Sequence, residues 1–263
     1  METILDKIIA GKKKEVDKLK KELAEDSSHP LHSILKEGRE AKRFFEKALK
    51  QPRLSIIAEI KRCSPSAGKI GEIPDASALA ALYAEGGASA ISVLTDRQNF
   101  GGSIEDLIEV KKATALPLLR KDFIIDPIQI AEAVFAGACA ILLIIAATKE
   151  KTKELFLEAE RLGLDVLIEV NNEEELDAAL VLGARIIGVN NRDLKTFQVD
   201  QSRALLLKKL IPDNIVTVAA SGMKTVDDVK KVREAGYDAA LIGQMLVESE
   251  NAVSIIEKIR GEK

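Results

Sequence analysis

Two charged residues stand at the end of a strongly apolar segment near the start of the chain. The segment from Ile56 to Ile70, IIAEIKRCSPSAGKI, carries Glu59 and Lys61 two positions apart and continues into a Ser-Pro-Ser-x-Gly turn. Side chains two apart on a strand share one face, so this pair extends a face that is otherwise apolar. It is either an ion pair that plugs the mouth of a barrel or sheet, or part of a reactive site.

The same arrangement recurs along the chain, which favours a reactive site. Later apolar segments end in polar residues or a Ser-Gly turn, at Arg120, Lys121 and Asp122, at Glu169, at Asn190, Asn191 and Arg192, and at Ser221 and Gly222. One shared site explains five strands with polar groups at the same end better than five separate plugs do.

Composition limits the classes of protein. The chain has 263 residues, 46% of them hydrophobic, and a net charge of −3, so neither a nucleic-acid surface nor a polybasic membrane anchor is indicated. The Lys-rich segment GKKKEVDKLKK near the start is interpreted as a solvated helix face. We expect a soluble, cytoplasmic protein, a monomer or weak homo-oligomer, that acts on a small molecule.

Few residues are available for metal or thiol chemistry. His29 and His32 are the only histidines and lie together near the start, so an imidazole-based metal site or catalytic triad is not expected. Cys63 and Cys139 lack metal-ligand spacing and are interpreted as reduced, structural thiols. The chemistry must therefore depend on lysines and carboxylates, with no metal and no cofactor.

An internal repeat predicts the fold. Four similar segments, each a helix-ending glycine followed by a buried strand, contain Gly87, Gly137, Gly183 and Gly236, with steps of 50, 46 and 53 residues. Each step is long enough for two strand-helix units, and LPLLRK, DVLIEV and IVTVAA supply the strands between them. With SIIAEI at the start, eight parallel strands alternate with helices, which predicts a (β/α)8 TIM barrel. An open doubly wound sheet would not place all the polar strand ends together.

Helix-start signals support this reading. Ser103 with Asp106, Asp126 with Pro127, and a capping box of Asn172 with Glu175 are each expected to begin a helix.

Residues 1–50 lie outside the eightfold pattern and are predicted to be an N-terminal helical extension packed on the barrel of residues 51–263. Apolar residues spaced from Ile4 to Leu23 indicate one amphipathic helix, and Phe44, Phe45 and Leu49 a second. We expect both helices beside the catalytic mouth; the alternative is a helical plug over one barrel end.

The last two strands suggest a phosphate site. Ser221 and Gly222 follow the seventh strand and Gly243 follows the eighth, where barrels commonly bind phosphate through backbone N–H groups. Glycine is also common in ordinary tight turns, so the phosphate site is inferred from the location of these glycines after the last two strands. Opposite this site lie two lysines, Lys61 and Lys121, and two carboxylates, Glu59 and Glu169. They would provide an acid and a base for catalysis. The alternative is that they form only a structural charge network. Without a dinucleotide or P-loop motif, a cofactor-free conversion of a phosphorylated small molecule is expected.

The motifs together resemble one known family. IIAEIKRCSPSAG, TDRQNFGGSIEDL, LLRKDFIIDPIQI, VLIEV, IIGVNNRDLKTF and ASGMKT are similar to segments of indole-3-glycerol phosphate synthase, a lyase of tryptophan biosynthesis. The resemblance extends from the N-terminal helices to the last strand. It implies closure of the ring of 1-(2-carboxyphenylamino)-1-deoxyribulose 5-phosphate with loss of carbon dioxide and water.

The resemblance also implies roles for individual residues. Lys121 would be the general acid, Glu169 would serve in dehydration, Lys61 would contact anionic groups of the substrate, and Glu59 would hold and tune the lysines. The substrate-binding residues would be Asn190 and Arg192 at the anthranilate side, Ser64 and Phe100 in the pocket lining, and Ser221, Gly222, Gly243 and Gln244 around the phosphate.

The chain departs from the family pattern at three places. Ala220 stands where the family usually has glutamate, so one active-site carboxylate is missing. Gln244 and Met245 replace small or acidic residues, and Cys63 stands where Ala or Lys is more common. Alternatives to the synthase are another barrel enzyme, such as an isomerase of the same pathway or an aldolase with a Schiff base on Lys121, and a redesigned or decayed scaffold.

Overall fold

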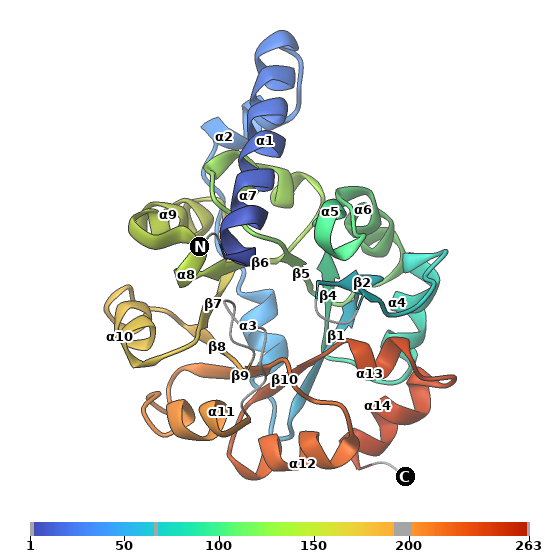
Figure 1. The fold of residues 1–263 in the computed structure, drawn as a ribbon. Coiled ribbons are helices and arrows are strands. Elements are labelled where there is room, and N and C mark those ends of the chain that lie inside the picture. Colours follow the sequence, from blue (N-terminus) through green and yellow to red (C-terminus); the bar gives the residue numbers. More distant parts are fainter. Residues whose placement is uncertain (1–2, 66–67, 192–200, 262–263) are drawn as a thin grey trace.

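Eight parallel strands close into a barrel in a computed structural model that describes residues 3–65, 68–191 and 201–261 (Figure 1). The strands are β1 (Ser55–Ile60), β4 (Ala90–Leu94), β5 (Leu118–Lys121), β6 (Ala140–Ile144), β7 (Asp165–Val170), β8 (Ile186–Asn190), β9 (Val216–Ala220) and β10 (Ala239–Ile242). Each strand pairs with its neighbours along the sequence, and β1 pairs with both β4 and β10. The predicted (β/α)8 barrel is confirmed.

A ring of helices surrounds the strands (Figure 1). The main outer helices are α4 (Ala76–Glu85), α6 (Ile104–Ala113), α7 (Pro127–Phe135), α9 (Thr152–Arg161), α10 (Glu173–Val181), α11 (Gln201–Lys208), α12 (Val226–Glu234) and α14 (Ala252–Arg260). The four repeated glycines that follow helices all have positive φ, between 78° and 87°. The repeat therefore marks helix ends where glycine has no steric penalty, as expected.

The predicted helix starts are present, with one difference. The Ser103 hydroxyl accepts the Asp106 N–H at the start of α6, and Asp126 with Gln129 forms a full capping box at the start of α7. Asn172 caps α10 by accepting the N–H of Glu175, but the Glu175 carboxylate accepts from the backbone N–H of Asn171. The expected capping box is thus displaced by one residue, because Glu175 reaches past the cap.

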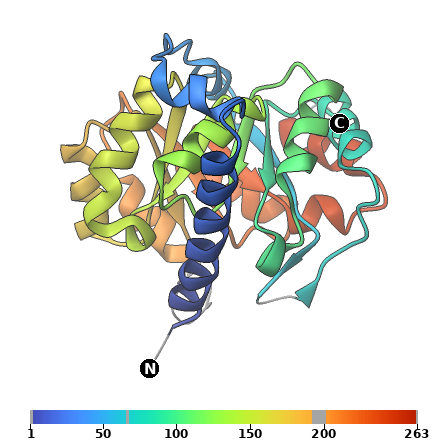
Figure 2. The same ribbon diagram turned by 90° about the horizontal axis from the view of Figure 1, so that it is seen from above.

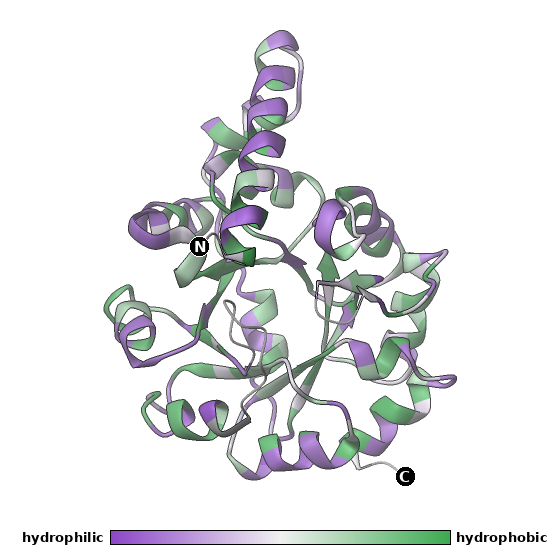
Figure 3. Cartoon of the chain, viewed as in Figure 1, coloured by the Kyte–Doolittle hydropathy of each residue, from purple (hydrophilic) through white to green (hydrophobic). Residues whose placement is uncertain are grey.

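Alternate strand residues separate two apolar cores. In β1, Ile56, Ala58 and Ile60 pack outward against the helices, whereas Ile57 faces the barrel interior. Figure 3 shows the apolar residues gathered on the strands, while hydrophilic residues predominate on the part of α1 that extends beyond the barrel. This alternation leaves the inward positions at the carboxyl ends free to carry polar groups.

The N-terminal segment reaches both ends of the barrel. Helix α1 (Ile4–Glu25) runs along the barrel side (Figure 2), and its Leu5 and Ile8 line the cavity at the carboxyl ends of the strands. After α2 (Leu31–Lys36), α3 (Phe44–Leu49) lies at the opposite end and appears at the centre of the ring in Figure 1. The expectation that both helices lie at the mouth is therefore right for α1 and wrong for α3.

Helix α3 plugs the amino-terminal end of the barrel. Phe45 and Leu49 are fully buried and pack with first residues of strands, such as Ala90 and Ala239. The Asp165 carboxylate at the start of β7 accepts the backbone N–H groups of Phe45 at 3.0 Å and Glu46 at 3.2 Å. An anion at a helix N-terminus is stabilised by these otherwise unpaired donors, so α3 is held by both packing and charge.

Several short elements lie at the carboxyl end of the barrel and were not expected from the sequence. They are β2 (Cys63–Ser64) paired with β3 (Gly68–Lys69), α5 (Arg97–Phe100), α8 (Ile145–Thr148), the 3-10 helix η1 (Lys149–Lys151) and α13 (Gln244–Val247). Over the described residues, none of the helices has the length and apolar character that crossing a membrane requires.

The plug at the barrel base predicts unequal roles for two adjacent phenylalanines. Phe45→Ala should lower the free energy of unfolding by ~3–5 kcal/mol, because it empties a fully enclosed site. Phe44→Ala, at a side chain 55% exposed, should change it by less than ~0.5 kcal/mol. Urea unfolding followed by circular dichroism measures both; equal effects would mean that α3 does not plug the barrel.

Candidate active site

The polar strand ends meet in one cavity at the carboxyl face of the barrel. Eleven of the twelve residues expected at the site line it: Glu59, Lys61, Ser64, Phe100, Lys121, Glu169, Asn190, Ser221, Gly222, Gly243 and Gln244. The twelfth, Arg192, lies outside the described residues. Residues separated by up to 185 positions therefore share one site, as the repeated pattern at strand ends predicts.

A buried ion pair occupies the end of β1. The Lys61 Nζ lies 2.7 Å from the Glu59 Oε2, and the Glu59 side chain is only 5% exposed. Burial alone would raise the pKa of Glu59, but the positive charges of Lys61 and Lys121 outweigh it and hold this pKa below its ordinary value. Glu59 is therefore an anion at neutral pH, placed between two lysines.

The second carboxylate is held from the neighbouring strand. The Asn190 Nδ2 donates to the Glu169 Oε1 at 2.8 Å, and both residues are buried. Because the amide donor fixes one carboxylate oxygen, the other oxygen of Glu169 keeps acceptor capacity for a group in the cavity. Glu169 and Asn190 thus form one unit of the site.

The turn after β9 has an uncommon backbone. Ser221 has φ +65° although it is not glycine, and Gly222 follows with φ +82°. Asn191 holds this turn: its N–H donates to the Ala220 carbonyl at 3.0 Å, and its Nδ2 donates to the Ser221 carbonyl at 3.2 Å. A strained residue held by surrounding bonds is typical of a functional site. Asn191 therefore supports the turn from outside the cavity.

Gly243 is constrained by the ion pair of β1. A methyl group on Gly243 would overlap the Glu59 carboxylate. The sequence suggested that this glycine allows close approach of a phosphate, and the structure adds that it gives Glu59 its space. A larger residue here would displace Glu59 whatever binds in the cavity.

Apolar side chains that the sequence analysis did not assign to the site form its walls. Leu5 and Ile8 come from α1, and Leu94, Phe123 and Leu241 from the strand ends. The Phe100 and Phe123 rings lie with centroids 6.2 Å apart, in the range of a favourable aromatic pair. Apart from Phe100, these side chains occupy positions that resemble any core position in sequence, so only the closed barrel shows that they face a ligand cavity.

Two polar residues beside Lys121 do not line the cavity. Arg120 is 4% exposed and donates to the Gln129 carbonyl, and it pairs with Asp122 and Glu132. Strand alternation explains this, because Arg120 and Asp122 lie on the face opposite to Lys121. Of the three charges at this strand end, only Lys121 is directed into the site.

Comparisons with known proteins agree with this geometry. A family model described as indole-3-glycerol phosphate synthase matches residues 5–259. The chain belongs to the indole-3-glycerol phosphate synthase family. The matched range includes α1, α2 and α3 as well as the barrel, so the N-terminal helices are part of what the family shares.

Curated relatives support the family over nearly the whole chain. An indole-3-glycerol phosphate synthase of Chlorobium chlorochromatii is 46% identical over 97% of this chain and 99% of its own. Indole-3-glycerol phosphate synthases of Ruminiclostridium cellulolyticum and Bacillus cereus are each 43% identical over 98% of this chain, and over 99% and 98% of their own lengths.

A solved structure shows likeness of fold alone. Thiamine phosphate pyrophosphorylase from Pyrococcus furiosus superposes with a TM-score of 0.57 at 18% identity, over 79% of this chain and 94% of its own. At that identity the likeness extends to the barrel and not to the chemistry.

The ion pair at the end of β1 predicts how Glu59 titrates. Lys61→Met should raise the pKa of Glu59, because it removes the stronger of two stabilising cations and leaves the effect of burial; Lys121→Met should raise it less. The ¹³C chemical shift of the Glu59 carboxyl, followed against pH by NMR, measures this. An unchanged or lower pKa in Lys61→Met would contradict the electrostatic account of the site.

Proposed function

We propose that this chain is an indole-3-glycerol phosphate synthase. It would convert 1-(2-carboxyphenylamino)-1-deoxyribulose 5-phosphate into indole-3-glycerol phosphate, carbon dioxide and water. The single observation that carries the proposal is the convergence of Lys61, Lys121, Glu59 and Glu169 beside the Ser221–Gly222 turn in one cavity of a chain of this family.

The cavity supports one orientation of this substrate. We assign the phosphate to the backbone around Ser221, Gly222 and Gly243, with Gln244 next to it, because loops after the last two barrel strands supply N–H donors for anions. The anthranilate side is assigned to Asn190 and to Arg192.

The walls of the cavity suit the aromatic ring. Phe100 packs with Phe123 there, and Ser64 adds a hydroxyl at the rim. A ring between apolar walls with charged groups at its edges matches a substrate that is aromatic at one end and anionic at the other.

Ring closure needs a proton donor. The ring carbon that bears the carboxylate attacks the ribulose carbonyl carbon, a C–C bond forms, and the carbonyl oxygen takes a proton to become a hydroxyl. Lys121, at the end of β5 and directed into the cavity, is assigned as this general acid. Glu59, which pairs with Lys61, would hold the lysines in place.

Loss of carbon dioxide and water completes the reaction. The C–C bond to the carboxylate breaks and its electrons return to the ring, so that the carboxylate needs a fixed positive charge until it leaves; Lys61 is assigned this role. The new hydroxyl then takes a proton and leaves as water, and the methylene carbon beside the ring nitrogen loses a proton, so that the C=C bond of the indole ring forms and the nitrogen keeps its hydrogen. Glu169, held by Asn190, is assigned to this dehydration. Acid, base and charge suffice, so no metal or cofactor is required by the scheme.

The working form of the enzyme is also a proposal. We expect a monomer or weak homo-oligomer, because one chain already brings the four assigned catalytic residues together in one cavity. Cys63 and Cys139 are both unpaired, which fits a reducing compartment such as the cytoplasm.

The assigned acid and base give the first test. The parent chain should turn over the carboxyphenylamino substrate, followed by indole fluorescence, and Lys121→Ala and Glu169→Gln should each lower kcat by at least ~10² while circular dichroism stays unchanged. The exposed residues Lys112 and Glu174 give matched controls, Lys112→Ala and Glu174→Gln, which should keep parental rates. Near-parental rates in both site variants would refute the mechanism, and borohydride trapping of Lys121 with a carbonyl substrate would indicate a Schiff-base aldolase instead.

The departure at Ala220 gives a second test. Ala220 lines the cavity next to Ser221, and a longer carboxylate there would project toward the bound substrate. Ala220→Glu should raise kcat/KM, by less than the ~10²–10³ typical of a preorganised polar group, because the added charge also acts on Glu169. Assays at several pH values, with Ala220→Gln as the uncharged control, measure this. An efficiency no higher than the parent's at every pH would show that the site works without that carboxylate.

A further inference from the structure

One lysine of the Lys-rich N-terminal segment is buried. The segment was interpreted as a solvated face, and Lys13 and Lys14 are exposed, but the Lys12 side chain is only 2% exposed. Lys12 follows Ile8 by four positions and precedes Val16 by four, so it lies on the apolar stripe that α1 presents to the barrel. The interpretation is therefore wrong at Lys12, and a buried charge needs an explanation.

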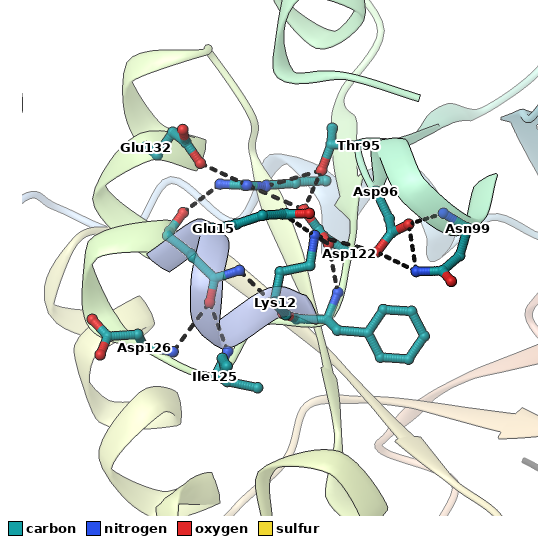
Figure 4. A network of polar contacts seen from close by, with 12 residues as sticks. Lys12, Glu15, Thr95, Asp96, Asn99, Asp122, Ile125, Asp126 and Glu132 are labelled. Carbon is teal, nitrogen blue, oxygen red and sulfur yellow. Dashed lines mark hydrogen bonds and ion pairs between the residues drawn. The ribbon is translucent and has the colours of Figure 1, made fainter. Parts of the chain in front are cut away.

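The Lys12 ammonium group joins three carboxylates. Its Nζ lies 2.6 Å from the Glu15 Oε2, 2.9 Å from the Asp122 Oδ1 and 3.3 Å from the Asp96 Oδ2 (Figure 4). Asp96 and Asp122 follow β4 and β5 and are 1% exposed. Lys12 thus connects α1 with the loops after two neighbouring strands.

Asp122 fixes the backbone directly after Lys121. Its Oδ1 accepts the N–H of Phe123 at 2.8 Å, and its Oδ2 accepts the Thr95 hydroxyl at 2.6 Å and an Arg120 N–H at 3.2 Å. Burial favours the protonated acid, but the charges of Arg120 and Lys12 outweigh it and lower the pKa of Asp122 to about 2. Asp122 is therefore an anion that holds the chain on the far side of Lys121.

Asp96 fixes the neighbouring loop. Its carboxylate accepts the backbone N–H of Asn99 at 2.7 Å and caps α5, which ends at Phe100. Phe100 in turn packs against Phe123 in the cavity. Lys12 therefore holds together the two loops that carry the aromatic wall and the assigned acid.

We propose that Lys12 is a positioning residue for the reaction: through Asp122 and Asp96 it holds the ends of β5 and β4 so that Lys121 is directed at the substrate carbonyl. The inference rests on the proposed function of Lys121. It assigns the N-terminal helix a part in catalysis beyond covering the cavity with Leu5 and Ile8.

The opposite possibility is that this ion network only stabilises the fold. A positioning role and a purely structural role predict different results when Lys12 is substituted with and without Lys121 present. A residue that acts by placing Lys121 loses its effect on rate once Lys121 is gone, whereas a structural residue lowers the amount of folded enzyme in either background.

The experiment is a double-mutant cycle on the full chain. Lys12→Met in the parent should lower kcat by ~10- to 100-fold with little change in KM, because small misplacements of a catalytic group are costly. In the Lys121→Ala background the same substitution should change kcat by less than about twofold. Lys12→Arg, which keeps the charge, should restore most of the parental rate. Lys18→Met on the exposed face of α1, at a side chain 79% exposed, is the matched control and should keep the parental rate.

Removal of Lys12 takes a positive charge away from the buried carboxylates of Asp96 and Asp122, which can unfold the chain. A charge-balanced variant is therefore needed as well. Lys12→Met with Asp96→Asn removes one charge of each sign and keeps a capping side chain at residue 96. It should fold and still show the loss of kcat. Parental kcat in a folded Lys12→Met, or equal losses in both backgrounds, would overturn the proposal. So would failure to fold of both Lys12→Met and the charge-balanced double variant. Parental rates in Lys121→Ala alone would instead refute the role assigned to Lys121, and a parent chain without turnover of the carboxyphenylamino substrate would refute the proposed function.

Discussion

Closure of the sheet between β1 and β10 is the constraint on which the rest of the molecule depends. These strands lie at opposite ends of the barrel sequence, and their pairing joins Ser55 with Ala239 and Ala58 with Ile242. Only a closed barrel brings the end of β1 next to Gly243, so that the Glu59 carboxylate occupies the space that a side chain there would fill. The position of Glu59 in the site therefore depends on closure of the barrel.

Much of the site was predictable because its chemistry follows strand periodicity. Parallel strands all end at the same face, and alternate residues point inward, so Glu59, Lys121, Glu169 and Asn190 could be assigned to one cavity before any contact was known. The same alternation separates Lys121 from Arg120 and Asp122, which face the helices. The strands themselves followed from the repeat of glycine-ended helices and buried apolar segments.

The features that the sequence did not show depend on contacts between residues that are far apart along the chain. Phe45 and Leu49 indicated an amphipathic helix, but nothing local distinguishes a helix at the mouth from one at the base. Lys12 gave a signal that was not used, a charge at a stripe position of α1, because its partners Asp96 and Asp122 are more than eighty positions away. Asn191 was expected only as one of the polar residues at a strand end, and it holds the Ser221 turn from outside the cavity by donating to backbone carbonyls.

The plug formed by α3 has a consequence for synthesis of the chain on the ribosome. Phe45 and Leu49 leave the ribosome early, yet they belong to a buried cluster that includes strand residues as far along the chain as Ala239. At ~5–20 residues per second, their complete binding site forms on the order of ten seconds or more after they emerge. Helix α3 must therefore remain without its final partners, and available to chaperones or to other chains, until nearly the whole protein has been made.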